Sequence, residues 1–222
     1  IENLVIGNED PRAFSAGANL ALILSLAQEG DWDELALAVR QFQKASMSLR
    51  YSPFPVVVAP FGLTLGGGAE FTLHADRVQT HAELYMGLVE AGVGLLPAGG
   101  GTKEMLLRFT QELAPYEEAD PFEAVKRAFQ LIAMARTSTS ALEARKMGFL
   151  RDGDRISMNR DFLIADAKRR VLELAPDYRP PLPPRIRVLG SEALGNLRYA
   201  VWSFREAGEI TDGHVDRVIH RV

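Results

Sequence analysis

The sequence predicts an α/β protein, and three observations support this prediction. Short apolar runs rich in β-branched residues alternate with longer segments of helical periodicity. Glycine-rich turns stand directly before two predicted helices, in "LGGGAE" and "PAGGGT". The 222 residues are 47% hydrophobic and 24% charged, which suits one packed domain with a small appendage.

The first elements are a strand, two helices and a second strand. The run "ENLVIG" predicts the first strand, and the turn-rich loop "GNEDPRAFSAGAN" follows it. An apolar helix is expected from about Leu20. The apolar stripe of a second, amphipathic helix consists of Trp32, Leu35, Val39, Phe42 and Leu49. Pro53 and Pro55 end that helix, and "PVVVAP" predicts a buried strand.

The middle of the chain repeats this alternation. A helix is expected from about Gly67 to Ala75, and "DRVQTH" predicts the next strand. A second glycine-dense loop, "EAGVGLLPAGGGT", leads into the helix that holds Met105 to Phe109. The acidic segment "QELAPYEEADP" is then expected to form an exposed loop.

Helices dominate the remainder. They are predicted near Phe122 to Met134, Ser140 to Met147 and Asn159 to Leu174, with Gly148 ending the second of them. We expect residues 1–175 to form the catalytic core, and residues 176–222 to form a proline-rich linker and a helical appendage that turns near Gly208. The chain begins without methionine and ends in the helix-like "DRVIHRV", so we expect it to be part of a longer polypeptide.

Composition excludes several classes of protein. A formal net charge of −4 argues against general nucleic-acid binding, and the absence of cysteine excludes disulfides and thiol chemistry. No apolar run is long enough to span a membrane, and no N-x-[ST] sequon is present. A cytoplasmic location is therefore expected.

Several possible site types are disfavoured by residue order and spacing. "GGGTKE" lacks the order of a nucleotide-binding P-loop, and the four histidines lack metal-site spacing, so we expect no metal. Ser15 lies in "FSAG" rather than in a nucleophile elbow. A serine hydrolase of the ClpP type would require Ser15 to pair with His74 or His81, and it is the weaker hypothesis.

The turns in "FSAGAN" and "LGGGAE" predict a shared function. Each places small residues just before a helix, where free N–H groups point outward and the helix dipole is positive. Two such donors that converge would stabilise a carbonyl oxygen as it gains charge. Considered singly, none of these features implies a function: each turn could be an ordinary tight turn, Glu70 an ordinary acid in the first turn of a helix, and Glu90 an ordinary loop carboxylate.

In combination, these motifs resemble the crotonase family of enoyl-CoA hydratases and isomerases. "RAFSAGANL" resembles its first oxyanion segment, "FGLTLGGGAEFTLHADRV" its second, and "YMGLVEAGVGLLPAGGGT" the segment with its second glutamate. "TSTSALEARKMGFL" resembles a later family helix. The resemblance covers roughly residues 1–175 and implies the ClpP/crotonase fold of repeated ββα units, with a helical C-terminal region.

The resemblance also implies roles for individual residues. The backbone N–H groups of Ala18 and Gly67 would form the oxyanion hole, and Glu70 and Glu90 would hold and activate water. The residues implied to bind substrate or coenzyme A are Ala16, Ala18, Gly66, Gly67 and Ala98. The implied reaction adds water to a trans-2-enoyl-CoA, with no cofactor beyond the coenzyme A of the substrate.

The sequence departs from the family pattern at three places. Ala98 stands where the family often has glycine, Met86 replaces the usual aromatic residue, and the N-terminal part of the family fold is missing before Ile1. The acidic segment and the appendage resemble fused bacterial fatty-acid oxidation proteins, which implies an upstream 3-hydroxyacyl-CoA dehydrogenase domain and a possible homo-oligomer. A double-bond isomerase and a non-catalytic scaffold domain remain as competing hypotheses to the hydratase.

Overall fold

The computed structural model describes residues 2–116, 118–186, 189–211 and 213, and within them seven strands form two parallel sheets. The first sheet has the order β1-β3-β5-β7 and the second the order β2-β4-β6. The strands are β1 Leu4–Ile6, β2 Ala13–Ser15, β3 Val56–Val58, β4 Gly62–Leu65, β5 Arg77–His81, β6 Leu84–Gly87 and β7 Arg155–Ser157. Val57 at the centre of β3 pairs with both Val5 and Arg77.

Successive strands alternate between the two sheets. The pairs β1–β2, β3–β4 and β5–β6 each send one strand to each sheet, and each pair is followed by helical structure. This is the repeated ββα pattern that the family resemblance implied. The α/β, crotonase-like fold class is confirmed.

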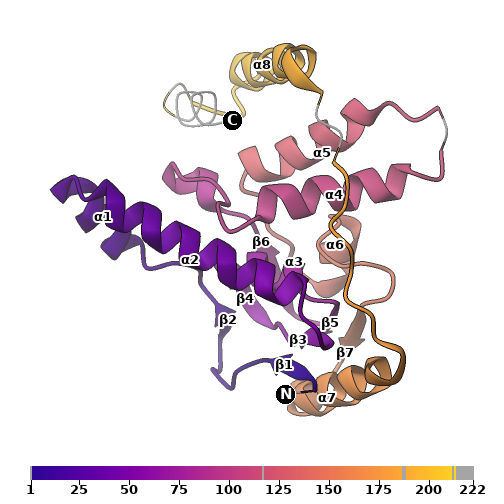
Figure 1. The fold of residues 1–222 in the computed structure, drawn as a ribbon. Coiled ribbons are helices and arrows are strands. Elements are labelled where there is room, and N and C mark those ends of the chain that lie inside the picture. The colour runs from indigo at the N-terminus through magenta and orange to yellow at the C-terminus, as the bar shows by residue number, and fades with distance from the viewer. Residues whose placement is uncertain (1, 117, 187–188, 212, 214–222) are drawn as a thin grey trace.

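The described part of the chain contains eight α-helices (Figure 1). They are α1 Leu20–Glu29, α2 Trp32–Arg50, α3 Gly67–His74, α4 Gly101–Leu113, α5 Pro121–Ala133, α6 Ala141–Lys146, α7 Leu163–Leu174 and α8 Gly190–Glu206. Short 3₁₀ turns are η1 Glu90–Val93, η2 Arg160–Phe162 and η3 Ala175–Asp177. Helix α6 begins directly after Ser140, the predicted start of this helix. The side chain of Ser140 accepts from Glu143 N–H, and Gly148 beyond the helix has a left-handed φ of 82°.

The main hydrophobic core packs α3, α4, α5 and α6 against β5 and β6. Leu73, Met105 and Phe149 in this core are completely buried. A second cluster packs α7 against β3 through Val57, Leu163 and other side chains. Figure 1 shows α7 and α8 at opposite ends of the molecule, with residues 178–186 running along its side.

Four strands are absent from the sequence prediction. The structure places β2 inside the segment interpreted as a loop, β4 directly before the glycine run, and β6 and β7 where no strand is expected. Each has only three or four residues, too few to show a period of two.

The apolar stripe predicted for α2 is partly wrong. Trp32 is 62% exposed, and among the described residues of that helix Ser46 alone is fully buried. None of the described residues of the apolar helix α1 is buried, and α1 projects from the body of the fold in Figure 1, whereas α2 runs back to pack on α3. The helix expected in "DRVIHRV" lies outside the described residues.

Candidate active site

The two predicted oxyanion segments lie side by side. Gly17 adopts a φ of +92°, and a Cβ built on it would lie only 3.5 Å from the backbone nitrogen of Gly67. Ser15 is packed so closely on α3 that a Cβ on Gly68 would lie 2.4 Å from the Ser15 Cβ. The missing side chains of these glycines therefore let the loop after β2 meet the amino end of α3.

Both predicted donors lack an acceptor. Within the described residues, neither the N–H of Ala18 nor that of Gly67 donates a hydrogen bond. Gly67 is the first residue of α3, and Gly66 before it, with a φ of 53°, provides no side-chain cap. Such first-turn amides form an anion-binding end of a helix when a ligand reaches them.

Glu70 lies one turn into α3 with only 2% of its surface exposed. Its Oε1 accepts a hydrogen bond of 2.8 Å from the backbone N–H of Gly101, at the amino end of α4. Burial raises the pKa of Glu70 above its ordinary value, while the N–H groups of the 99–101 turn oppose this rise. The turn therefore stabilises the ionised form of a buried carboxylate.

Glu90 approaches the same helix end from η1. A Cβ built on Gly66 would lie 3.2 Å from Glu90 Oε1, so glycine at that position leaves room for the carboxylate. Glu90 Oε2 is buried and has no hydrogen-bond partner among the described residues. Burial, aided by the nearby charge of Glu70, raises the pKa of Glu90 to about 7.

The remaining predicted site residues differ in exposure. Ala16 and Ala18 are exposed and Gly66 is buried. Ala98 is exposed, and its carbonyl oxygen accepts a 2.7 Å hydrogen bond from Gln43 Nε2 of α2. A role for Ala16, Ala18 and Ala98 in binding coenzyme A stays a prediction.

The structure adds two neighbours that sequence reasoning does not assign to this site. Gly101 supplies the amide that holds Glu70, and its only signal in the sequence is the glycine-dense loop around it. Phe42 of α2 is expected only in an apolar stripe, yet a Cβ on Gly99 would lie 2.0 Å from its ring and 2.7 Å from Glu70 Oε2. The ring therefore lies beside the Glu70 carboxylate and forms one wall of the site.

The serine hydrolase hypothesis lacks its required pair. Ser15 Oγ accepts from the N–H of Gly17, and within the described residues neither His74 nor His81 lies within hydrogen-bond distance of it. His74 Nδ1 instead lies 2.7 Å from the carbonyl oxygen of Glu70. The described part of the chain also contains no group of His, Asp or Glu that could hold a metal ion.

Comparison with known proteins gives the same class of fold. An enoyl-CoA hydratase from Bacillus anthracis superposes with a TM-score of 0.62, at 21% identity, over 98% of this chain and 73% of that one. The two parallel sheets joined by ββα units, with glycine turns at helix starts, thus define a crotonase-fold protein.

Sequence comparison identifies the family. The enoyl-CoA hydratase/isomerase family matches residues 1–117, which is more than half of the 222-residue chain. The chain belongs to this family.

Two relatives illustrate its range. The chain is 42% identical over 212 residues to a Bacillus subtilis protein named "Probable 3-hydroxyacyl-CoA dehydrogenase", covering 95% of this chain and 26% of that protein. It is 28% identical over 189 residues to the human mitochondrial methylglutaconyl-CoA hydratase, covering 85% of this chain and 49% of that protein. The chain thus spans about a quarter of the B. subtilis protein and half of the human one.

Proposed function

We propose that this chain is an enoyl-CoA hydratase domain, which adds water to a trans-2-enoyl-CoA and gives a 3-hydroxyacyl-CoA. The observation that carries the proposal is the placement of two carboxylates, the buried Glu70 and the half-buried Glu90, at the amino end of α3. They lie beside backbone N–H groups that have no acceptor within the described residues. Addition of water needs such a pair, because one group must accept a proton from water while another supplies one to carbon.

The two carboxyl groups suit different halves of this reaction. Glu70, held by the Gly101 amide, is the carboxylate that accepts a proton as the oxygen of water bonds to the β-carbon. The electrons of the double bond move to the thioester oxygen, which Ala18 and Gly67 would stabilise as an enolate. Glu90, with a pKa of about 7, then donates a proton to the α-carbon.

The proposed chemistry uses only groups of the protein and the substrate. Coenzyme A is part of the substrate, and no step transfers electrons to or from a separate cofactor. The product is a 3-hydroxyacyl-CoA, which is what a 3-hydroxyacyl-CoA dehydrogenase oxidises. The name of the B. subtilis relative therefore supports an upstream dehydrogenase domain of the same polypeptide and a role in fatty-acid β-oxidation.

A direct assay tests the proposal. A short trans-2-enoyl-CoA added to the protein should lose its conjugated-thioester absorbance, while the 3-hydroxy product accumulates and is identified by mass spectrometry. Conversion of a 3-enoyl-CoA to a 2-enoyl-CoA without hydration would instead establish the isomerase. Absence of both reactions in the folded protein, including its full-length form, would favour the scaffold.

Location, assembly and domain division remain predictions. No helix of the described residues is long and apolar enough to cross a membrane. The cytoplasmic location and the homo-oligomer stay predictions, as does the division into residues 1–175 and 176–222.

A further inference from the structure

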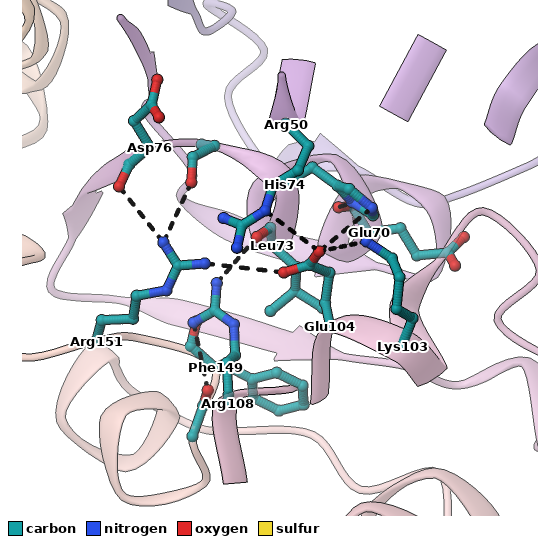
Figure 2. A network of polar contacts seen from close by, with 12 residues as sticks. Arg50, Glu70, Leu73, His74, Asp76, Lys103, Glu104, Arg108, Phe149 and Arg151 are labelled. Carbon is teal, nitrogen blue, oxygen red and sulfur yellow. Dashed lines mark hydrogen bonds and ion pairs between the residues drawn. The ribbon is translucent and has the colours of Figure 1, made fainter. Parts of the chain in front are cut away.

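A buried group of charges lies directly behind Glu70, outside the proposed reaction centre (Figure 2). Its centre is Glu104 of α4, whose side chain is completely buried. Three cationic side chains and the ring of His74, from four segments, surround its carboxylate: Lys103 Nζ at 2.5 Å, Arg50 Nε at 3.6 Å, and His74 Nε2 and Arg151 Nη2 at 3.8 Å. Burial alone would raise the pKa of Glu104, but the charges of Arg50 and Lys103 hold it below its ordinary value.

His74 connects this charge group to the backbone of Glu70. It is the last residue of α3, and its Nδ1 lies 2.7 Å from the carbonyl oxygen of Glu70. A carbonyl oxygen only accepts hydrogen bonds, so Nδ1 carries the proton. Burial lowers the pKa of His74, which keeps the ring neutral, and its Nε2 lies 3.8 Å from Glu104 Oε1 without a hydrogen bond between them.

The same ring supports the turn that holds the Glu70 carboxylate. Gly100 has a φ of +113°, and a Cβ on it would lie 2.8 Å from both Cε1 and Nε2 of His74. The next residue, Gly101, donates its N–H to Glu70 Oε1. His74 thus contacts Glu70 at its backbone and, through the 99–101 turn, at its carboxylate.

Glu104 fixes the other side of this arrangement. Its own N–H donates to the carbonyl oxygen of Gly100, and its carboxylate pairs with Arg151, whose Nη1 donates to the carbonyl oxygen of Ala75 directly after α3. It therefore ties the amino end of α4, where Gly101 lies, to the carboxyl end of α3. Displacement of either end would lengthen the hydrogen bond between Gly101 and Glu70.

We propose that His74 and Glu104 are positioning residues, which hold the Glu70 carboxylate against the Gly101 amide in the orientation that hydration needs. The proposal rests on the proposed hydratase function, but the hydrogen bond that it concerns can be observed without turnover. An orientation that is wrong by about 1 Å can lower a rate by about 10²-fold. A group that serves only folding would affect stability and leave the turnover of the folded enzyme unchanged.

Two variants of the full chain test the proposal. Glu104→Gln keeps the shape of the side chain and removes its charge. Asp154→Asn is the matched control, because Asp154 is also buried and accepts from Val78 and Arg151 N–H groups of the same region, away from the 99–101 turn. The measurements are kcat and KM with a short enoyl-CoA, and the Gly101 amide proton shift in ¹⁵N-labelled protein.

We expect Glu104→Gln to lower kcat by about 10²-fold with little change in KM. It should also move the Gly101 amide resonance upfield, as expected for loss of a hydrogen bond to a carboxylate. Asp154→Asn should lower the melting temperature while kcat and the Gly101 resonance stay close to the wild type. If Glu104→Gln does not fold, His74→Asn, which keeps a donor near the Nδ1 position, should reproduce the same two changes.

A folded Glu104→Gln protein with wild-type kcat and an unchanged Gly101 resonance would overturn the proposal. An equal loss of kcat and an equal shift of the Gly101 resonance in Asp154→Asn would overturn it too, because the effect would then come from lower stability in general. If the wild type does not hydrate enoyl-CoA but the Gly101 resonance moves only in Glu104→Gln, the positioning contact stands and the proposed function fails.

Discussion

The carboxylate of Glu70 accepts a 2.8 Å hydrogen bond from the backbone N–H of Gly101, across 31 residues of sequence. This amide belongs to the first residue of α4, so the positive end of that helix faces the carboxylate. Glu90 Oε2, in contrast, is buried without a hydrogen-bond partner among the described residues. The two carboxyl groups at one site therefore differ in what stabilises their charge.

Removal of either carboxylate should affect turnover more than folding. Glu70→Gln and Glu90→Gln should each lower kcat by about 10² to 10⁴, the range for loss of one general acid or base. Circular dichroism should show an intact fold, because glutamine keeps the shape of each side chain. Glu83→Gln, at an exposed position before β6, is the control and should retain wild-type turnover. Near-wild-type hydration in either folded variant would exclude that residue from the mechanism.

The rate of hydration should decrease as the pH rises through about 7. The pKa of Glu90 is raised to about 7, so below that value its carboxyl group keeps the proton that the α-carbon must receive. Above it, the fraction of protonated Glu90 falls about tenfold per pH unit. A profile of kcat/KM across neutral pH measures this decrease. Glu90→Gln should lose both the decrease and most of the activity. A kcat/KM that does not change across neutral pH would mean that a group other than Glu90 donates the proton.

The same shift in pKa predicts a pH-dependent stability that needs no substrate. The pKa of Glu90 is raised from 4.5 to about 7, so the folded state holds a proton that the unfolded state releases between these values. The stability contribution of the protonated group is fully present below pH 4.5 and is lost as the pH rises through about 7. Glu90→Gln, which cannot ionise, should therefore be more stable than the wild type above this range.

Above this pH range, Glu90→Gln should raise the free energy of unfolding by about 1 to 3 kcal/mol. This gain is smaller than the full pKa shift of Glu90 would give, because Glu90 is partly exposed. Urea unfolding at about pH 4 and at about pH 8, on either side of the titration, measures it. The two proteins should be equally stable at the acidic pH. A constant difference at both pH values would point to packing rather than ionisation.

The sequence predicted the helices and three strands of the first sheet, β1, β3 and β5, but no strand of the second sheet. Three consecutive valines between prolines identify β3, and repeated caps such as Ser140 identify helix starts. The strands β2 and β7, with three residues each, form only because a neighbouring strand supplies their hydrogen bonds, and such long-range pairing leaves no local pattern. The glycine turns and glutamates that the family resemblance grouped do lie together, although they come from segments far apart in the sequence. The contacts of Phe42, His74 and Glu104 with the site depend on tertiary packing and were not predictable from spacing.

A pair of glycine substitutions should separate backbone strain from steric overlap. Gly30 and Gly148 both follow helices with left-handed φ values, of 73° and 82°. Nothing lies within 4 Å of a Cβ built on Gly30, whereas one on Gly148 would lie 2.6 Å from the buried ring of Phe109. Gly30→Ala should cost about 1 kcal/mol from the backbone alone.

Gly148→Ala should cost about 1 to 3 kcal/mol more, because the ring of Phe109 must move in a packed core. Differences in urea midpoint between the two variants measure the excess. Equal losses of stability in the two variants would mean that the ring of Phe109 moves without a cost in free energy.

The oxyanion assignment uses two backbone N–H groups, and the position of Gly67 allows one of them to be removed selectively. Gly67 is the first residue of α3, where proline is compatible with the helix because the N–H there has no helical partner. Gly67→Pro should therefore abolish measurable turnover with α3 retained, because one oxyanion donor contributes about 2.7 to 4 kcal/mol to the transition state.

Gly67→Ala is the matched variant, because it keeps the N–H and adds only a methyl group. That methyl would lie 3.0 Å from Phe42 Cζ, so the ring must shift by a few tenths of an ångström. We expect Gly67→Ala to keep turnover within about tenfold of the wild type, well above Gly67→Pro, since the donor that stabilises the oxyanion is still present. Measured kcat values for both variants, with helix content from circular dichroism, decide the matter. Equal activity in the two folded variants would show that the Gly67 amide does not bind the thioester oxygen.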